Sequence, residues 1–463
     1  MFKKEVYINR RAKLKKLVKS GIILILGNNE TPMNFSANGY HFRQDSDFLY
    51  FFGHDYAGMA GIIDVDNGDE FIIADDFSMD DIIWMGPQPS VKSLAQEIGV
   101  EKTAPFGDLA KLLTKAADSG RKVHILPQYR HDNMIYLNQV LGIPFDKMKE
   151  AASVELIKAI VSLRSIKDEY EIAEIDKALD IGYIMHTEAM KKIAPGVVER
   201  EVAGLMEGIS LANGGAPSFP IILSVNGQTL HNHYHGNVMQ KGDLLLADAG
   251  CETTMHYASD NTRTSPVSGK FTTKQREIYE IVMNANNHAM SLIKPGITYR
   301  EVHLAAAKVL ATGLTELGIM KGNPEEAVRE GAHALFQPHG LGHMMGLDVH
   351  DMEGLGEDFV GYDDKIKRST QFGLSGLRLG RELKPGFVLT DEPGCYFIPE
   401  LIDSWKSENK FMDFINYEKL ESYRDFGGIR LEDDILVTPD GNRLLGSKRM
   451  PITPEEVEDC MRS

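Results

Sequence analysis

The chain has 463 residues, of which 43% are hydrophobic and 25% charged, and its formal net charge is −17 at pH 7. This length suits about two or three domains, and the acidic balance disfavours nucleic acids and anionic membranes, because both select basic surfaces. No apolar run approaches the ~18 residues of a membrane span, and the amino terminus has no long apolar core like that of a signal peptide. We therefore expect a cytoplasmic protein with no membrane or nucleic-acid partner.

Short apolar runs alternate with helical stretches in the first part of the chain. Runs rich in Ile, Leu and Val predict buried strands at residues 21–27, 71–74 and 122–127. Strands that alternate with helices indicate an α/β domain.

A domain boundary is predicted near residue 160. Ser165 and Asp168 have the spacing of a capping box, in which two side chains satisfy the first backbone N–H groups of a helix. Apolar residues then follow with helical periodicity, at Ile172, Ile175 and Leu179. We expect an amino-terminal domain at residues 1–160 and a second domain at residues 161–463.

An internal repeat runs through the second domain with an offset of 100 residues. Both copies contain an Ala-Met pair, an isoleucine, a Pro-Gly pair and an Arg-Glu-Val triplet, at residues 189–202 and 289–302. Each copy is expected to form a helix, a Pro-Gly turn, a second helix and then strands, with Thr298 and Glu301 as a cap in the second copy. Two such halves about a pseudo-twofold axis would enclose a cleft between their sheets.

Four carboxylates and one imidazole form a candidate metal site: Asp248, Asp260, His343, Glu392 and Glu432. Burying one unpaired carboxylate costs several kcal/mol, so this charge is expected to be offset by two divalent cations. A metal pair can activate water. Oxygen ligands with one imidazole favour Mn²⁺, and less selectively Co²⁺, Fe²⁺ or Zn²⁺.

Simpler interpretations of these residues stay open at this point. Asp248 ends an apolar run but could form an Asp-Ala-Gly turn, and Glu432 could pair with Arg430 on a solvated strand face. Cys251 and Cys395 lie near proposed ligands, but small buried filler is the better interpretation of both.

The five motifs, in this order, resemble those of the proline-specific pita-bread metallopeptidases, the Xaa-Pro dipeptidases (prolidases) and Xaa-Pro aminopeptidases. They are Leu-Ala-Asp-Ala-Gly, Ser-Asp-Asn-Thr-Arg-Thr, Pro-His-Gly-Leu-Gly-His, Asp-Glu-Pro-Gly and Ile-Arg-Leu-Glu-Asp. Residues 42–53 also resemble the amino-terminal part of that branch. The resemblance implies a pita-bread catalytic domain after the α/β domain, short proline-containing peptides as substrates, and a homodimer or higher homo-oligomer.

The resemblance also implies roles for the metal ligands. Asp260 and Glu432 would bridge the two ions, Asp248 would complete one, and His343 with Glu392 the other. Glu392 would also be the general base.

Three further histidines are assigned roles by the resemblance. The run Asn-Gly-Gln-Thr-Leu-His ends at His231, the expected active-site histidine, with His233 as the alternative because a tyrosine follows it. Alternation of His231, His233 and His235 on a strand would also allow all three to be ligands. His350 is expected to contact the scissile peptide group and His339 to line the substrate pocket.

The resemblance leaves two activities open. A dipeptidase must bind the free carboxylate of proline, for which arginine is the natural partner. Residues 373–386 resemble the prolidase version, which places Arg378 at that carboxylate, although a surface salt bridge is the simpler interpretation. We expect an Xaa-Pro dipeptidase, with Arg430 as a second substrate-binding residue.

Three alternatives to the dipeptidase are weighed against it. The first is an Xaa-Pro aminopeptidase that acts on longer peptides. The second is a metal-free binding module, against which the retention of all five ligands argues. The third is an organophosphate hydrolase.

Overall fold

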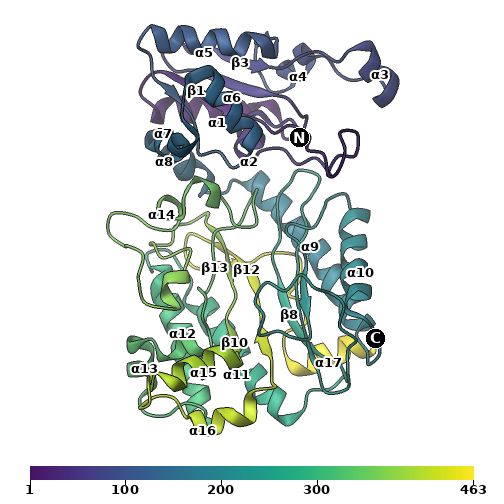
Figure 1. Ribbon diagram of the computed structural model, residues 1–463, viewed down its shortest axis with the longest axis vertical. Helices are drawn as coiled ribbons and strands as arrows, with labels where there is room; N and C mark the ends of the chain where they lie inside the picture. Colours follow the sequence, from purple (N-terminus) through teal and green to yellow (C-terminus); the bar gives the residue numbers. More distant parts are fainter. The chain divides into compact units, whose positions relative to one another are not determined.

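The computed structural model describes residues 1–463, and the chain folds into two compact units (Figure 1). The amino-terminal unit comprises Met1–Arg164 with Met352–Phe359, and the carboxyl-terminal unit comprises Ser165–Asp351 with Val360–Ser463. That the short segment Met352–Phe359 belongs with the first unit was not predicted from the sequence. No helix in either unit combines the length and the apolar character needed to cross a bilayer.

A mixed five-stranded sheet forms the centre of the amino-terminal unit, in the order β4-β3-β2-β1-β5. Its strands are β1 (Ile22–Leu26), β2 (Ala60–Asp64), β3 (Glu70–Ile73), β4 (Lys102–Ala104) and β5 (Val123–His124). β1 pairs antiparallel with β2 and parallel with β5. The helices of this unit are α1 (Lys4–Leu17), α2 (Ser46–Phe52), α3 (Met79–Met85), α4 (Val91–Glu97), α5 (Leu109–Asp118), α6 (His131–Leu141), α7 (Met148–Ala151) and α8 (Val154–Arg164).

The structure confirms the strands predicted at residues 21–27 and 71–74, as β1 and β3. The strand predicted at residues 122–127 is only two residues long. It ends early because the carbonyl of Ile125 accepts a hydrogen bond from the Ser153 N–H group instead of a strand, and Pro127 has no N–H group to donate.

The carboxyl-terminal unit contains both copies of the repeat. The first copy has α9 (Glu169–Lys192), α10 (Glu199–Ala212) and an antiparallel sheet of β6 (Ile222–Ser224), β7 (Leu244–Asp248) and β8 (Thr262–Pro266). The second has α11 (Thr273–Leu292), α12 (Tyr299–Glu316) and an antiparallel sheet of β9 (Val388–Asp391), β12 (Asp433–Val437) and β13 (Asn442–Leu444). A separate two-stranded antiparallel sheet pairs β10 (Gly394–Tyr396) with β11 (Gly428–Arg430). The remaining helices of this unit are α13 (Pro324–Glu330), α15 (Pro399–Ser407), α16 (Tyr417–Leu420) and α17 (Pro454–Arg462). Helix α14 (Glu357–Val360) lies at the end of the short segment that belongs with the amino-terminal unit.

The two copies of the repeat have the same local structure. α9 packs on α10, and α11 packs on α12. Both turns contain a left-handed glycine, since Gly196 and Gly296 each have a φ of 90°. The predicted cap of α12 is confirmed: the Thr298 hydroxyl accepts from the Glu301 N–H group at 3.2 Å, and the Glu301 carboxylate accepts from the Thr298 N–H group at 2.9 Å.

The capping box predicted for α9 is wrong by three residues. Asp168 is the cap, and its carboxylate accepts hydrogen bonds from the N–H groups of Tyr170 and Glu171. The Glu171 carboxylate accepts from the Asp168 N–H group in return, at 3.1 Å. Ser165 lies outside the helix and its hydroxyl accepts from Arg381, so it is not available as a cap.

The two sheets carry acidic residues at corresponding strand ends. Asp248 is the last residue of β7, and Glu392 directly follows β9. Asp260 lies just before β8, and Glu432 directly precedes β12. Each half therefore supplies one acid at the end of a strand and one acid before the antiparallel neighbour of that strand.

Candidate metal centre

One cavity in the carboxyl-terminal unit, of about 360 Å³, brings together every residue predicted for the site. Its lining includes the five acidic and imidazole groups Asp248, Asp260, His343, Glu392 and Glu432. It also includes the five predicted catalytic and substrate-binding residues His231, His339, His350, Arg378 and Arg430, together with His233.

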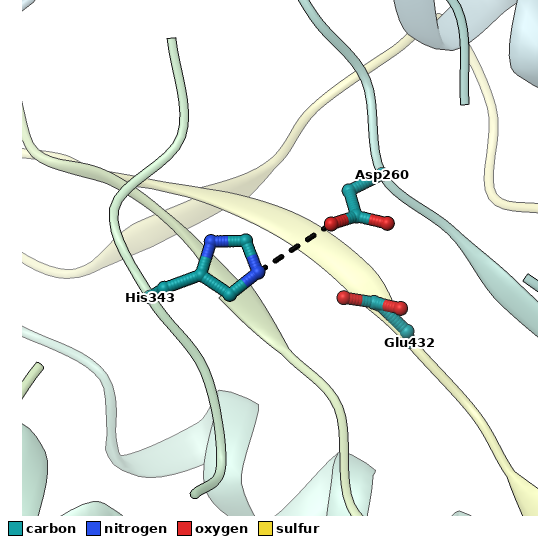
Figure 2. A group of neighbouring side chains, drawn as sticks. All are labelled: Asp260, His343 and Glu432. Carbon is teal, nitrogen blue, oxygen red and sulfur yellow. Dashed lines mark ion pairs between the residues drawn. The ribbon is translucent and has the colours of Figure 1, made fainter. Parts of the chain in front are cut away.

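Three of these side chains converge on a common point. Ligand atoms of Asp260, His343 and Glu432 all lie within 4.8 Å of one another, and all three residues are buried. Figure 2 shows the three side chains directed towards one another from separate segments, with His343 Nε2 3.4 Å from Asp260 Oδ2. Glu392 Oε1 lies 3.6 Å from the same nitrogen. Three of the predicted carboxylate ligands are thus grouped around the imidazole nitrogen of the fourth ligand, His343.

The backbone around His343 fixes the direction of its ring. The His343 N–H group donates to Thr390 Oγ1 at 3.1 Å, and the Thr390 N–H group donates to the His343 carbonyl at 3.0 Å. Nδ1 of the ring lies 3.0 Å from the Met344 carbonyl. With the proton on Nδ1 donated to that carbonyl, the lone pair of Nε2 faces the carboxylates, as a metal ligand requires.

Asp248, the fifth predicted ligand, is held by an arginine. Arg430 Nη2 donates to Asp248 Oδ2 at 2.6 Å, and the other carboxylate oxygen, Oδ1, is buried without a hydrogen-bond partner. Asp260 Oδ1 is also buried without a partner. Two orphaned carboxylate oxygens in one cavity are costly in an empty site and fit coordination of a cation.

The site is too acidic to ionise fully by itself. Burial, and then the negative charges of Asp260 and Glu392, raise the pKa of Glu432 well above its usual range. Burial, and then Asp248, do the same for the pKa of Asp260. Burial raises the pKa of Glu392 to about 7, opposed by His343 and Arg430. Positive charge in the cavity would reverse these shifts, so the donor set fits divalent cations.

The simpler interpretation of Glu432, as part of a solvated strand face, is wrong. Arg430 and Glu432 are only 4% and 2% exposed, so they do not form a solvated ion pair. Cys251 and Cys395 are buried and do not line the cavity. The thiol of Cys251 donates to the Ala178 carbonyl, which agrees with its prediction as small buried filler.

The histidine-rich segment is not a strand, contrary to one of its interpretations. His231 lies in a turn and residues 232–237 have no regular structure, because no neighbouring strand pairs with them. His231 and His233 line the cavity. His235 does not, and its Nε2 lies 3.1 Å from the Ile221 carbonyl. The three rings therefore do not form a common ligand face.

The other predicted residues lie around the acids. The rings of His350 and His343 have centroids 4.2 Å apart, and His339 Nδ1 lies 3.8 Å from Glu392 Oε2. Arg378 is half-buried and follows the short helical turn Leu374–Gly376, whose Gly376 also lines the cavity.

Three residues that hold the site were not predicted from the sequence. Thr262 Oγ1 donates to Glu432 Oε2 at 2.7 Å and accepts from Arg430 Nε at 3.1 Å. The Tyr396 hydroxyl accepts from Arg430 Nη1 at 2.8 Å and lies 2.9 Å from His339 Nε2. Asp434 Oδ2 accepts from the Asp260 N–H group at 2.9 Å. The only sequence signal was their position within or near the five motifs.

Comparison with known proteins agrees with this geometry. The chain matches metallopeptidase family M24 over residues 173–439 and the aminopeptidase P N-terminal domain over residues 7–126. It is 33% identical to a human Xaa-Pro dipeptidase over 455 residues, covering 96% of this chain and 89% of the relative. It is 32% identical to a probable Xaa-Pro aminopeptidase of Coccidioides posadasii, covering 95% of this chain and 92% of the relative.

The fold is also similar to that of solved structures. Aminopeptidase P from Escherichia coli, solved with the inhibitor Pro-Leu, superposes with a TM-score of 0.82 at 30% identity, covering 100% of this chain and 98% of that one. The pita-bread architecture expected from the motifs is thereby confirmed. From its sequence, its fold and these relatives, the chain belongs to metallopeptidase family M24, in the branch of the Xaa-Pro dipeptidases and Xaa-Pro aminopeptidases.

Proposed function

We propose that this protein is a metal-dependent peptidase that hydrolyses the Xaa-Pro bond of short peptides, and specifically an Xaa-Pro dipeptidase. The observation that carries the proposal is that all ten predicted site residues line one cavity. Relatives named Xaa-Pro dipeptidase match nearly the whole chain. On this proposal residues 161–463 form the catalytic domain and residues 1–160 the amino-terminal domain.

The five residues Asp248, Asp260, His343, Glu392 and Glu432 would hold two divalent cations. Asp260 and Glu432 would be shared by both ions, which fits their position among the other donors. We propose Mn²⁺, because oxygen donors with a single imidazole favour it, with Co²⁺, Fe²⁺ or Zn²⁺ as substitutes. When bound, such a pair supplies an activated water and polarises the scissile carbonyl.

Residues of the chain would then move protons and orient the peptide. The Glu392 side chain is 18% exposed, whereas those of Asp248, Asp260 and His343 are 10%, 6% and 5% exposed. This access to water suits Glu392 as the group that accepts the proton of the attacking water and passes it to the leaving proline nitrogen. His231 and His350 would donate to the carbonyl oxygen as it gains negative charge.

Two arginine side chains, together with His339, would bind the rest of the substrate. Arg430 is fixed by Asp248 and Tyr396 and would present its guanidinium to the peptide beside the metals. Arg378 would pair with the free carboxylate of the dipeptide, and His339 would line the proline side of the cavity. An arginine in the cavity wall favours a dipeptidase, since a longer peptide carries its carboxylate elsewhere.

An Xaa-Pro aminopeptidase is the second candidate, because solved structures of aminopeptidase P match the whole chain. A metal-free binding module and an organophosphate hydrolase are the less favoured alternatives. We further propose a cytoplasmic homodimer or higher homo-oligomer. The support for an oligomer is α3, where the large apolar residues Met79, Ile83, Trp84 and Met85 are all exposed, Trp84 at 86%.

The decisive experiment compares Ala-Pro with Ala-Pro-Ala as substrates of the purified protein supplied with Mn²⁺. A chelator should abolish cleavage and Mn²⁺ should restore it. Asp260→Asn and Glu432→Gln should each remove most activity, because each residue is proposed to contact both ions. Active protein without divalent metal would refute the proposal, and a strong preference for Ala-Pro-Ala would assign an aminopeptidase.

A further inference from the structure

A fully buried arginine joins the two halves of the catalytic unit beside the candidate metal centre. Arg263 lies on β8 and is 1% exposed. Its Nη1 donates to the carbonyls of Thr262 at 2.9 Å and Glu432 at 2.7 Å. Its Nε donates to the Pro451 carbonyl at 2.9 Å. One guanidinium therefore holds the strand that follows Asp260 against the backbone of Glu432 itself.

The arginine is one member of an ion triad. Arg263 Nη2 donates to Asp433 Oδ1 at 2.6 Å, and Arg449 donates to Asp433 Oδ2 through Nε at 3.0 Å and Nη2 at 2.8 Å. The side chain of Asp433 is 3% exposed and that of Arg449 is 27% exposed. The carboxylate is thus saturated by two guanidinium groups, and the triad carries a net positive charge next to an acidic cavity.

The triad extends to a third segment of the site. Arg449 Nη2 also donates to Asn286 Oδ1 at 2.6 Å, and the Asn286 amide donates to the Asp391 carbonyl at 3.0 Å. Asp391 directly precedes Glu392. Through these contacts, one network touches the backbone at or within two residues of Asp260, Glu392 and Glu432, but no member of the network lines the cavity.

We propose that the Arg263–Asp433–Arg449 triad is a positioning element for metal binding. It sets the spacing between acids contributed by the two halves, and so determines how tightly the cations are held. This proposal rests on the ligand set proposed above. Arginine suits the task because its rigid fork of five N–H groups fixes several acceptors at once, whereas a lysine ammonium is a single flexible point charge.

The test measures Mn²⁺ affinity of the metal-free protein by titration calorimetry, together with the number of ions bound per chain. Arg449→Lys keeps the charge and is partly exposed, so it should fold, but it loses the forked contact to Asp433 and Asn286. We expect about 10- to 100-fold weaker Mn²⁺ binding, the range seen when groups that orient metal ligands are removed. Arg263→Lys should have the same or a larger effect.

The matched control is Arg443→Lys in the same unit. Arg443 also makes a forked pair, with Asp176 at 3.1 and 2.9 Å, but its side chain is 41% exposed. Its replacement should leave Mn²⁺ affinity within about twofold of the unaltered protein. At saturating Mn²⁺ the Arg449→Lys protein should recover most of its kcat, because no group that contacts substrate has changed.

Two results separate this proposal from the proposed function. If the Arg449 and Arg263 variants melt earlier but bind Mn²⁺ as the unaltered protein does, the triad only supports the fold and the positioning role is wrong. If the unaltered protein itself binds no Mn²⁺, the proposed ligand set fails, and the positioning role fails with it.

Discussion

Besides His343, four histidines line the cavity, and the surroundings of His339 and His231 differ. Burial, and then the charge of Arg430, lower the pKa of His339 to about 3, and its two nitrogens contact the Gly340 carbonyl and the Tyr396 hydroxyl. His339 is therefore neutral and already engaged. His231 has no hydrogen-bond partner within the protein, and burial and Arg430 lower its pKa as well. Its ring is neutral near pH 7 and available to a substrate.

Replacing His231 tests this distinction. His231→Ala should lower kcat by about 10² or more, the scale expected for a lost positioned donor, and should leave metal content nearly unchanged. His233→Ala is the neighbouring control and should be mild, and His343→Ala should lose metal. Steady-state kinetics and elemental analysis of the three variants decide the matter. A damaging His233→Ala with a mild His231→Ala would reverse the assignment.

Arg378→Ala tests substrate specificity. Loss of a charge-assisted pair to the dipeptide carboxylate should cost about 1.5–3 kcal/mol in kcat/KM, or roughly 10- to 150-fold, on Xaa-Pro dipeptides. Xaa-Pro tripeptides carry their carboxylate elsewhere and should lose much less. The dipeptide-to-tripeptide ratio is measured before and after the change. Equal losses on both substrates would mean that Arg378 only supports its loop.

Whether a site residue could be predicted from the sequence depends on how far along the chain its partners lie. The ten predicted residues that line the cavity could be identified because each lies in or near a short motif or segment that resembles the family. Thr262, Asp434 and Arg263 were not, because their roles depend on partners 170, 174 and 169 positions away. Such pairings are decided by the packing of one half on the other, which local sequence does not report.

At the level of elements, the Pro-Gly turns show what the repeat could predict. The shared pattern located both helix pairs and both turns correctly. Gly196 and Gly296 each have a φ of 90°, and a Cβ added at either would meet no atom within 4 Å. Only backbone strain, and no clash, therefore opposes a side chain at these positions.

Gly196→Ala and Gly296→Ala should each lower the free energy of unfolding by roughly 1–2 kcal/mol, the cost of a side chain in the left-handed region. Gly204 in α10 provides a control of opposite sign, since its Cβ would also meet no atom and its backbone is helical. Gly204→Ala should raise the free energy of unfolding by roughly 0.5–1 kcal/mol. Urea unfolding of the three variants gives the values, and loss in all three would contradict the strain argument.

Other elements were less predictable. The start of α9 was misplaced because both Ser165 and Asp168 have an acidic residue three positions later, and the sequence does not show which pair forms. The length of β5 depends on a hydrogen bond from Ser153 that leaves the sheet. In both cases a local pattern allowed two structures and a distant contact selected one.

On the scale of the whole molecule, two buried histidines affect how stability responds to acid. His303 and His333 are 0% and 3% exposed, their rings lie 6.3 Å apart, and no ring nitrogen of either has a hydrogen-bond partner. Burial lowers the pKa of His303 to about 3, helped by His333, and that of His333 to about 4. Both are neutral in the folded protein well below the ordinary histidine pKa of about 6.5.

Stability should therefore fall as pH falls below about 6.5, because the unfolded chain takes up protons that the folded chain does not. The loss continues until the folded pKa values near 3 and 4 are reached. Between pH 7.5 and 5.5 each histidine should contribute about 1.4 kcal/mol to the loss. His303→Phe should reduce the loss by that amount in urea unfolding, while His288→Phe, at an exposed position of α11, should not. Equal losses in His303→Phe and the unaltered protein would contradict the argument.

The division of the site between two halves has a consequence for the orientation in which a peptide binds. Two identical halves would form a cleft that a chain could enter equally well from either end. Here the first copy offers Asp248 and Asp260, whereas the second offers His343, Glu392 and Glu432, with Arg378 near them. The two halves share a scaffold but differ in the groups they present. This difference makes the two ends of the cleft chemically distinct, as an enzyme needs if it is to distinguish the amino end of a dipeptide from its carboxyl end.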